Sequence, residues 1–333
     1  MVCLAAPILQ LGLAGPAAAH VKWFAPYDVA GQPERLAEVF SPLFIELFVL
    51  GVLVLWCASA FEATRIGTLV SEAVETIFSG LRLRTDGLIR SGTAVFFIAI
   101  WVTGGIILTP ELKTTMAATS WLQAAIAIGT FWQSTLVFSG LGIVALFIQG
   151  IWTYGSFHMM DYPVFLSVAG YLIVRGLGRE TFLGLRAQDL IRWGVAVTLM
   201  WASVEKWAYP GWTFPVLHAH PDLSMGLDPK FFMSAAGIME FSLAFALLWT
   251  PLVRRIAAIV LLSMFVSAVF EFGKIDAIGH MLIIVLCVIL AADNRPSYKC
   301  SLKLAPVWYS TALTATISAY YIGHAYLYGT SIV

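Results

Sequence analysis

The amino-acid sequence predicts an all-α, polytopic integral membrane protein. Of the 333 residues, 60% are hydrophobic and only 11% are charged, whereas charged residues make up about 25% of an ordinary soluble domain. The apolar residues fall in blocks of about twenty, which is the length that an α-helix needs to cross about 30 Å of hydrocarbon. Basic and acidic residues number 19 each. This composition excludes an intrinsically disordered chain and a nucleic-acid binder, and it makes a lipid bilayer the expected partner.

Residues 1–19 have the features of a cleaved signal peptide. They are apolar and end in Ala17-Ala18-Ala19, which is an A-x-A cleavage pattern. Cleavage at this point makes His20 the new N-terminus, where an α-amine and an imidazole on one residue can chelate a metal such as copper. The alternative is that His20 only begins an extracytoplasmic arm, residues 20–40.

Ten transmembrane helices are expected, each from an apolar stretch. The chain between Lys113 and Asp161 contains no charged residue and is too long for one span, so we assign two helices joined near Gln133-Ser134. The sequence leaves open whether these two are separate spans. The predicted spans are a leading helix at 41–60, then 91–110, 114–132, 134–153, 160–176, 191–209, 231–250, 254–272 and 276–292, and a closing helix at 304–327.

Lysine and arginine set the expected orientation of these spans. With the N-terminus outside, 13 of the 19 basic residues fall in the inside segments 61–90, 175–192, 254–255 and 293–303. We therefore expect a multi-pass protein of a bacterial inner membrane, with both ends of the mature chain extracytoplasmic. Segment 61–90 also has a helical hydrophobic period, which is typical of an amphipathic helix lying in the headgroup layer. A helix that docks a protein partner is the alternative.

A repeat with a period of about 100 residues divides the spans into two units. Leu88-Ile89-Arg90 opens the second span in the same way as Leu190-Ile191-Arg192 opens the sixth. Residues 91–176 and 186–292 therefore look like two copies of a four-helix unit. Both copies start inside, which makes the repeat parallel, and parallel repeats in transporters place substrate sites at the repeat interface.

Three charged residues of the second unit are expected in the membrane or at its edge. Glu240 lies ten residues beyond Lys230, roughly 15 Å along a helix and so near mid-bilayer. Glu205 and Lys206 lie near the outer interface, where we expect a charged pair at the mouth of a site. Because ionisable groups in lipid are costly, these three are the candidate catalytic residues, with Glu240 as a proton-carrying or anchoring acid.

All six histidines lie on the expected outer side. His218 and His220 are two residues apart, a spacing that lets both bind one ion if the chain there is extended. Asp276 and His280 are four apart and share a helix face, so the carboxylate can orient the imidazole or both can hold a metal. Together with His20 these are the candidate metal ligands, and copper or another transition metal is the expected ion. The alternative is a set of interfacial histidines with no shared site.

The second unit resembles the DoxX family of four-helix membrane proteins. The resemblance rests on Leu190-Ile191-Arg192, Lys206, Gly237-Ile-Met-Glu240 and Arg254-Arg255-Ile-Ala-Ala. Ser203 departs from the glycine that the family usually shows three residues before the lysine. Family members with assigned roles belong to membrane redox complexes, including a quinone-reducing, sulfur-oxidising one. The resemblance therefore implies a redox-associated module in which Lys206 and Glu240 are the matched polar positions.

These observations favour a redox- or metal-linked module whose site lies on the extracytoplasmic side. A quinone or a haem is the alternative cofactor to a metal ion, and other membrane or extracytoplasmic redox proteins are the expected partners. Two other functions stay open: a transporter for a small solute or metal ion, and a non-catalytic anchor subunit of a larger complex. The sequence does not decide whether the protein is an enzyme.

Overall fold

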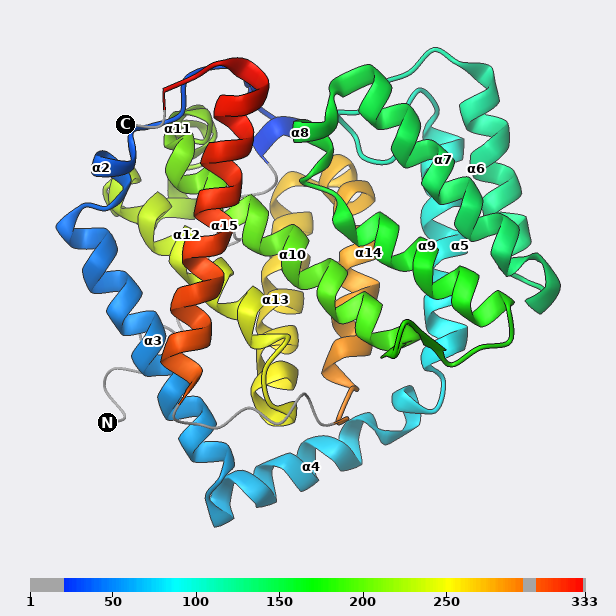
Figure 1. Ribbon diagram of the computed structural model, residues 1–333, viewed down its shortest axis with the longest axis horizontal. Coiled ribbons are helices and arrows are strands. Elements are labelled where there is room, and N and C mark those ends of the chain that lie inside the picture. The colour runs from blue at the N-terminus through cyan, green and yellow to red at the C-terminus, as the bar shows by residue number, and fades with distance from the viewer. Residues whose placement is uncertain (1–20, 296–303, 332–333) are drawn as a thin grey trace.

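The computed structural model describes residues 21–295 and 304–331, so the predicted signal peptide and His20 lie outside the described residues. Within these ranges the named secondary-structure elements are helices apart from one short hairpin, β1–β2 (Figure 1). The long helices are α3 (Pro42–Glu62), α4 (Arg65–Arg82), α5 (Thr85–Thr103), α6 (Ala117–Gly129), α7 (Leu136–Tyr154), α9 (Pro163–Gly176), α10 (Ala187–Ala208), α12 (Pro229–Ala246), α13 (Pro251–Phe272), α14 (Lys274–Ala291) and α15 (Ala305–Tyr328). The short elements are η1 (Val21–Trp23), α2 (Leu36–Val39), η2 (Gln133–Thr135), α8 (Ser156–Met159), β1 (Thr181–Phe182), β2 (Leu185–Arg186), η3 (Pro210–Trp212), α11 (Phe214–Ala219) and η4 (Pro221–Ser224).

Local chemistry explains where several helices begin. A proline stands in the first turn of α3, α9, α12, α13 and α15, where its missing N–H costs nothing. The side chains of Ser41 and Asp228 cap α3 and α12 by accepting hydrogen bonds from the amides of Phe44 and Phe231. Such caps satisfy amides that have no partner within the helix.

Each of the ten segments predicted to span the membrane contains a helix. Among the described residues, five helical stretches are long and apolar enough to cross a bilayer: α3, α5, α7 with the turn before it, α13 and α14. The predicted all-helical fold is thus confirmed, and its apolar helices suit a lipid bilayer. The number of spans stays a prediction, since α6 and α9 have only 13 and 14 residues.

The second predicted span is wrong at its C-terminal end. The helix stops at Thr103 because Gly104-Gly105 adopt φ values of 70° and 67°, which favour glycine and end a helix. The following residues, Ile106–Leu108, are buried without being helical. The side-chain amide of Gln123 donates hydrogen bonds to the carbonyl oxygens of Ile106 and Ile107 over 2.6 and 3.0 Å. The apolar residues after Thr103 are therefore explained by burial of a loop and not by a longer helix.

The long helices pack in an order that follows the chain. In the first half α5 contacts α6, α6 contacts α7, and α7 contacts α9, while in the second half α10 contacts α12, α12 contacts α13, and α13 contacts α14. The halves meet twice, through α9 against α10 and α14 against α5. Helices α3 and α15 contact each other and cover α12 at the edge opposite α6 (Figure 1).

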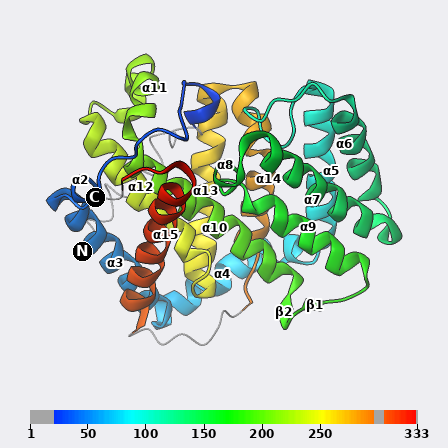
Figure 2. The same ribbon diagram turned by 45° about the horizontal axis from the view of Figure 1, so that its top comes forward.

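The two ends of the bundle differ. At one end, which we call the arm end, lie the N-terminal arm (residues 21–35), α8 and α11, and both ribbon views place the arm across this end (Figures 1 and 2). Helix α4 crosses the opposite end, which we call the α4 end. Its Ile66 and Ile77 are 64% and 73% exposed, as expected for a helix whose apolar face meets lipid. Glu75 of α4 pairs with Arg255 of α13 over 3.1 Å, so α4 is fastened to the bundle.

Candidate functional site

A cavity of about 60 Å³ lies among side chains of both halves of the bundle. It has room for about two water molecules, given the roughly 30 Å³ that each occupies in the liquid. Trp23 of the arm also forms part of its wall. We call this space the polar cavity, and its polar lining residues are Thr109, Asp161, Thr198, Lys206, Glu240 and His280. The cavity thus brings together three residues that the sequence singles out: Lys206, Glu240 and His280.

The ammonium of Lys22 is buried at the arm end between two carboxylates. Its Nζ donates hydrogen bonds to Asp161 Oδ2 and Glu205 Oε1, each over 2.5 Å. It also lies 5.7 and 5.4 Å from the ring centroids of Tyr27 and Trp212, within the range of cation–π attraction. Burial alone would lower the pKa of Lys22, but the charges of the two carboxylates outweigh burial and raise the pKa above its usual value. The ammonium therefore stays charged at neutral pH.

Glu205 and Lys206 are neighbours on α10 but pair with different partners. Successive residues of an α-helix are turned by about 100°, so Glu205 faces Lys22 while Lys206 faces α12. There the Nζ of Lys206 lies 2.6 Å from Oε2 of Glu240. Two separate ion pairs therefore replace the single Glu205–Lys206 pair expected at the mouth of the site. Glu240 is 7% exposed, so its carboxylate is buried against its partner.

Asp276 and His280 make the contact that their spacing predicts. Nδ1 of His280 lies 2.8 Å from Oδ2 of Asp276, one turn earlier on α14. His280 itself lines the polar cavity. The ring of Trp23 lies 4.7 Å from the imidazole centroid. It also covers Gly279, where a Cβ would come within 1.9 Å of the indole.

A second space of about 230 Å³, which we call the apolar groove, lies between α3, α12 and α13. Its walls are apolar except for the Lys206–Glu240 pair and Ser242, and they include the ring of Phe232. Leu50, Val54 and Ile256 line the groove and are also exposed on the surface of the bundle. Since Lys206 and Glu240 line the polar cavity as well, the ion pair stands between a groove that reaches the lipid-facing surface and a cavity beneath the arm.

The other predicted metal ligands do not converge. His218 is exposed near the end of α11 and His220 follows that helix, so the chain between them is not the extended one that would let both bind one ion. His220 instead pairs with Glu271, with 2.7 Å between Nδ1 and Oε1. In residues 21–295 and 304–331 no three His, Cys, Asp or Glu side chains are grouped to hold a metal ion. His20 lies outside those ranges.

Two further histidines fasten the arm to the bundle. Nε2 of His324 lies 2.7 Å from the carbonyl oxygen of Val29 and 2.8 Å from the hydroxyl of Tyr209. The ring of His158 packs against that of Tyr27, with 5.6 Å between centroids. The one-sided distribution of histidine in the sequence thus reflects, at these positions, contacts with the arm.

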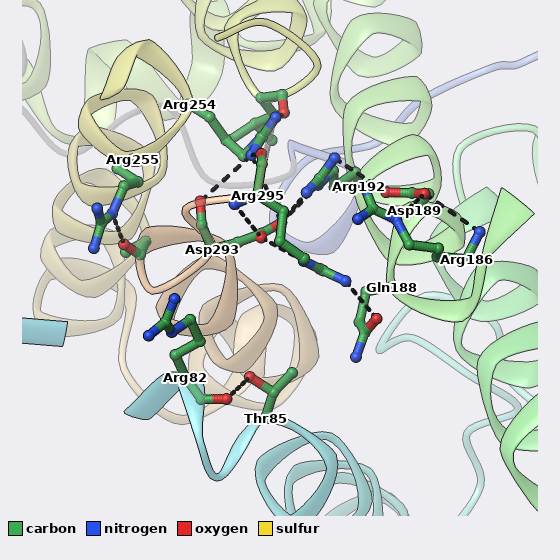
Figure 3. Close-up of polar contacts among 12 residues, drawn as sticks. Arg82, Thr85, Arg186, Gln188, Asp189, Arg192, Arg254, Arg255, Asp293 and Arg295 are labelled. Atoms are coloured by element: carbon green, nitrogen blue, oxygen red, sulfur yellow. Dashed lines mark hydrogen bonds and ion pairs between the residues drawn. The ribbon is translucent and has the colours of Figure 1, made fainter. Parts of the chain in front are cut away.

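At the α4 end, arginines surround Asp293 (Figure 3). The Nε atoms of Arg192 and Arg295 donate to its carboxylate over 2.6 and 2.8 Å, and Arg254 lies 3.7 Å away. Burial alone would raise the pKa of Asp293, but the hydrogen bond and charge of Arg295 and the charges of Arg192 and Arg254 lower it to about 2. This network joins α10, α13 and the chain after α14, so arginines that the sequence predicts to lie inside hold helix ends together.

Lys22, Trp23 and Asp161 are site residues that the sequence does not single out. Asp161 and Asp276 occupy similar places in the two predicted units, close to the start of α9 and of α14, and both carboxylates are buried. Lys22 and Trp23 carry no signal of their own, because an arm that folds back over the bundle is a long-range contact.

The chain matches no protein-family model, no curated protein and no solved structure with which it was compared. The resemblance of residues 186–292 to the DoxX family therefore stays a prediction.

Proposed function

We propose that this protein is a redox-linked membrane module that binds a quinone in the apolar groove. The observation that carries the proposal is the Lys206–Glu240 ion pair, which lines both the groove and the polar cavity. An apolar site with a few convergent polar groups is the usual form of a pocket for a lipophilic ligand. The resemblance to the DoxX family favours the same class of ligand.

The groove has the size and chemistry for the ring of such a ligand. Its volume of about 230 Å³ is below the roughly 300 Å³ at which pockets for drug-sized ligands begin. It therefore holds a ring and the first part of an isoprenoid tail. Leu50, Val54 and Ile256 connect the groove to the surface, where the rest of the tail lies in lipid.

The residues at the groove divide the work of binding and proton handling. Lys206 donates a hydrogen bond to a ring carbonyl, and Glu240 beside it accepts a proton as a carboxylate and gives it back as a carboxylic acid. A bound quinone supplies the electron chemistry, because it takes up two electrons and two protons on reduction. The polar cavity, which Glu240 and His280 both line, gives Glu240 access to water below the arm.

Quinone binding to the purified protein tests the proposal. We expect saturable binding of a short-chain quinone, followed by tryptophan fluorescence. The double variant Lys206→Met/Glu240→Gln removes a charge-assisted hydrogen bond worth about 1.5–3 kcal/mol, so its Kd should rise at least tenfold. Ala235→Phe, which fills the groove, should have the same effect, and Glu72→Gln on the exposed face of α4 should have none. Absence of saturable binding, or binding unchanged by Ala235→Phe, contradicts the proposal.

A metal-linked form of this function rests on His280. Asp276 orients its imidazole, which is how carboxylates support metal-binding histidines, and the ion would be copper or another transition metal. Elemental analysis of the purified mature protein tests this form. We expect one metal ion per chain, lost in His280→Ala and in His20→Ala. A metal-free protein that neither substitution changes contradicts it.

A transporter is the second candidate function, favoured by the packing of the two halves. The last helix of each half contacts the first helix of the other, α9 with α10 and α14 with α5, as expected of two parallel four-helix units. The polar cavity lies between these units, where parallel-repeat transporters bind substrate. Proteoliposomes tested with a panel of small solutes should then show uptake that Glu240→Gln abolishes and Glu72→Gln retains. No flux under any imposed gradient counts against transport.

The distribution of basic residues supports one orientation of this module. We place the protein in a bacterial inner membrane with ten spans and with the arm end and both chain termini outside. Labelling of single cysteines introduced at Lys113 and Arg84 by a membrane-impermeant reagent on intact cells tests this. Labelling at position 113 and not at 84 is expected, and the reverse pattern contradicts it.

A further inference from the structure

The Lys22 ammonium is held as a ligand is held in a binding site. Its partners come from four different segments: Tyr27 from the arm, Asp161 from the loop that precedes α9, Glu205 from α10 and Trp212 from η3. We call these four residues the ammonium box. Lys22 is 4% exposed, so the box encloses the ammonium almost completely.

The chemistry of the box suits a primary ammonium group. Two carboxylate oxygens at 2.5 Å take two of its three N–H donors, and two aromatic rings at 5.7 and 5.4 Å lie against the charge. Aromatic rings together with carboxylates are the groups that recognise ammonium ligands. A planar guanidinium matches paired acceptors on one carboxylate best, whereas the two acceptors here belong to different residues.

The box has acceptor capacity beyond what Lys22 uses. The second oxygen of Asp161, Oδ1, is buried and has no hydrogen-bond partner among the described residues. Asp161 is 2% exposed and lines the polar cavity. The site therefore remains attractive to a cation that approaches from the cavity.

Different contacts hold the two parts of the arm. The carbonyl oxygens of Val29 and Gly31 contact His324 and the hydroxyl of Tyr209, respectively, so residues near 30 are tied by the backbone. The Lys22 stretch is held mainly by side chains, namely the Lys22 ammonium and the ring of Trp23 on His280. Loss of the ammonium contact thus weakens the start of the arm without loosening its attachment near residue 30.

We propose that the ammonium box is a binding site for primary ammonium compounds and that Lys22 is its tethered occupant. A primary ammonium from outside competes with Lys22 for Asp161 and Glu205, and its entry releases the start of the arm from the polar cavity. No residue of the ammonium box lines the apolar groove, so this proposal does not depend on quinone binding.

Rescue of a variant that lacks the tethered ammonium tests the proposal. Lys22→Ala leaves the box empty, and ethylammonium reproduces the end of the lost side chain. We expect ethylammonium chloride to raise the Tm of this variant saturably by about 5 °C, beyond the effect of equal sodium chloride. Lys113→Ala, which removes an exposed lysine of the same end, should show no such increase. Neither should Lys22→Ala combined with Asp161→Asn and Glu205→Gln.

A second measurement on the unmodified chain keeps the test decisive if Lys22→Ala does not fold. Hydrogen–deuterium exchange of the peptide that contains Lys22 should increase severalfold with ethylammonium and stay unchanged with sodium chloride. Absence of rescue in a folded Lys22→Ala protein, or an arm whose exchange ethylammonium does not change, overturns the proposal.

The same chemistry exists in a lipid headgroup, and the exchange measurement separates the two sources. Nanodiscs of phosphatidylethanolamine and of phosphatidylcholine differ in the primary ammonium. Faster arm exchange in the first than in the second identifies the lipid headgroup as an occupant. Equal exchange in both, with a response to ethylammonium, identifies a soluble amine. Protection of the arm under all of these conditions contradicts the box as a ligand site.

Discussion

The Lys206–Glu240 pair should show strong energetic coupling, because its two charges meet within the bundle. At the observed 2.6 Å and an effective dielectric constant of about 20, the Coulomb attraction is about 6 kcal/mol. Desolvation of both ions offsets much of it. We therefore expect a coupling free energy of about 2–3 kcal/mol, which is the usual size for a hydrogen bond between charged groups. Glu240→Gln alone should destabilise the protein by about 3 kcal/mol, because it leaves Lys206 without an anionic partner.

A double-mutant cycle measures this coupling. It compares the free energies of unfolding of the unmodified chain, Glu240→Gln, Lys206→Met and the double variant in mixed micelles. The double variant should be more stable than the sum of the single effects predicts, because it leaves no unpaired buried charge. Glu72→Gln, at an exposed position of α4, should change stability by less than about 0.5 kcal/mol. A coupling below about 0.5 kcal/mol would refute the assignment of a buried ion pair between the groove and the cavity.

Three further predictions address the ends of the bundle. Asp293→Asn should lower the free energy of unfolding by about 2 kcal/mol at pH 7, since the folded-state pKa of Asp293 is about 2 against an ordinary 3.8. The ionised carboxylate contributes this stability above pH 4, and the contribution is lost as the pH falls toward 2. Acid titration of unfolding checks this, and a cost that persists at pH 2 contradicts it. Gly279→Val should displace Trp23 and speed hydrogen exchange of the arm, whereas unchanged exchange would mean that the indole does not rest on this glycine. A dye on a cysteine at Ile77 should report an apolar environment in liposomes and one at Glu72 a polar environment, and equal signals would place α4 away from the lipid.

The parts of the fold that depend on local sequence could be predicted. Apolar blocks of the right length locate all ten helical segments, and the amphipathic period of residues 61–90 locates α4. The spacing of Asp276 and His280 predicts their contact, because residues four apart on a helix are neighbours. The boundary of the second span could not be predicted from hydropathy, since Ile106–Leu108 are apolar but follow two glycines with positive φ.

The parts of the site that depend on long-range contacts could not be predicted. Lys22 meets Glu205 across 183 residues of sequence, and no local pattern indicates which acids an arm residue will reach. Glu205 and Lys206 look like a pair because they are adjacent, but helical geometry turns them to different neighbours. The histidines of the described residues lie on one side of the predicted topology without sharing a metal site, because sidedness does not determine where each ring packs.

The most direct test of the central claim, that the Lys206–Glu240 pair closes a quinone-binding groove, is photocrosslinking with a photoreactive short-chain quinone. Mass spectrometry should find the label on groove-lining residues of α3, α12 and α13. Excess unlabelled quinone should compete with the label, and Ala235→Phe should abolish it. Labelling that is confined to other helices, or that persists at the groove in Ala235→Phe, would contradict the account.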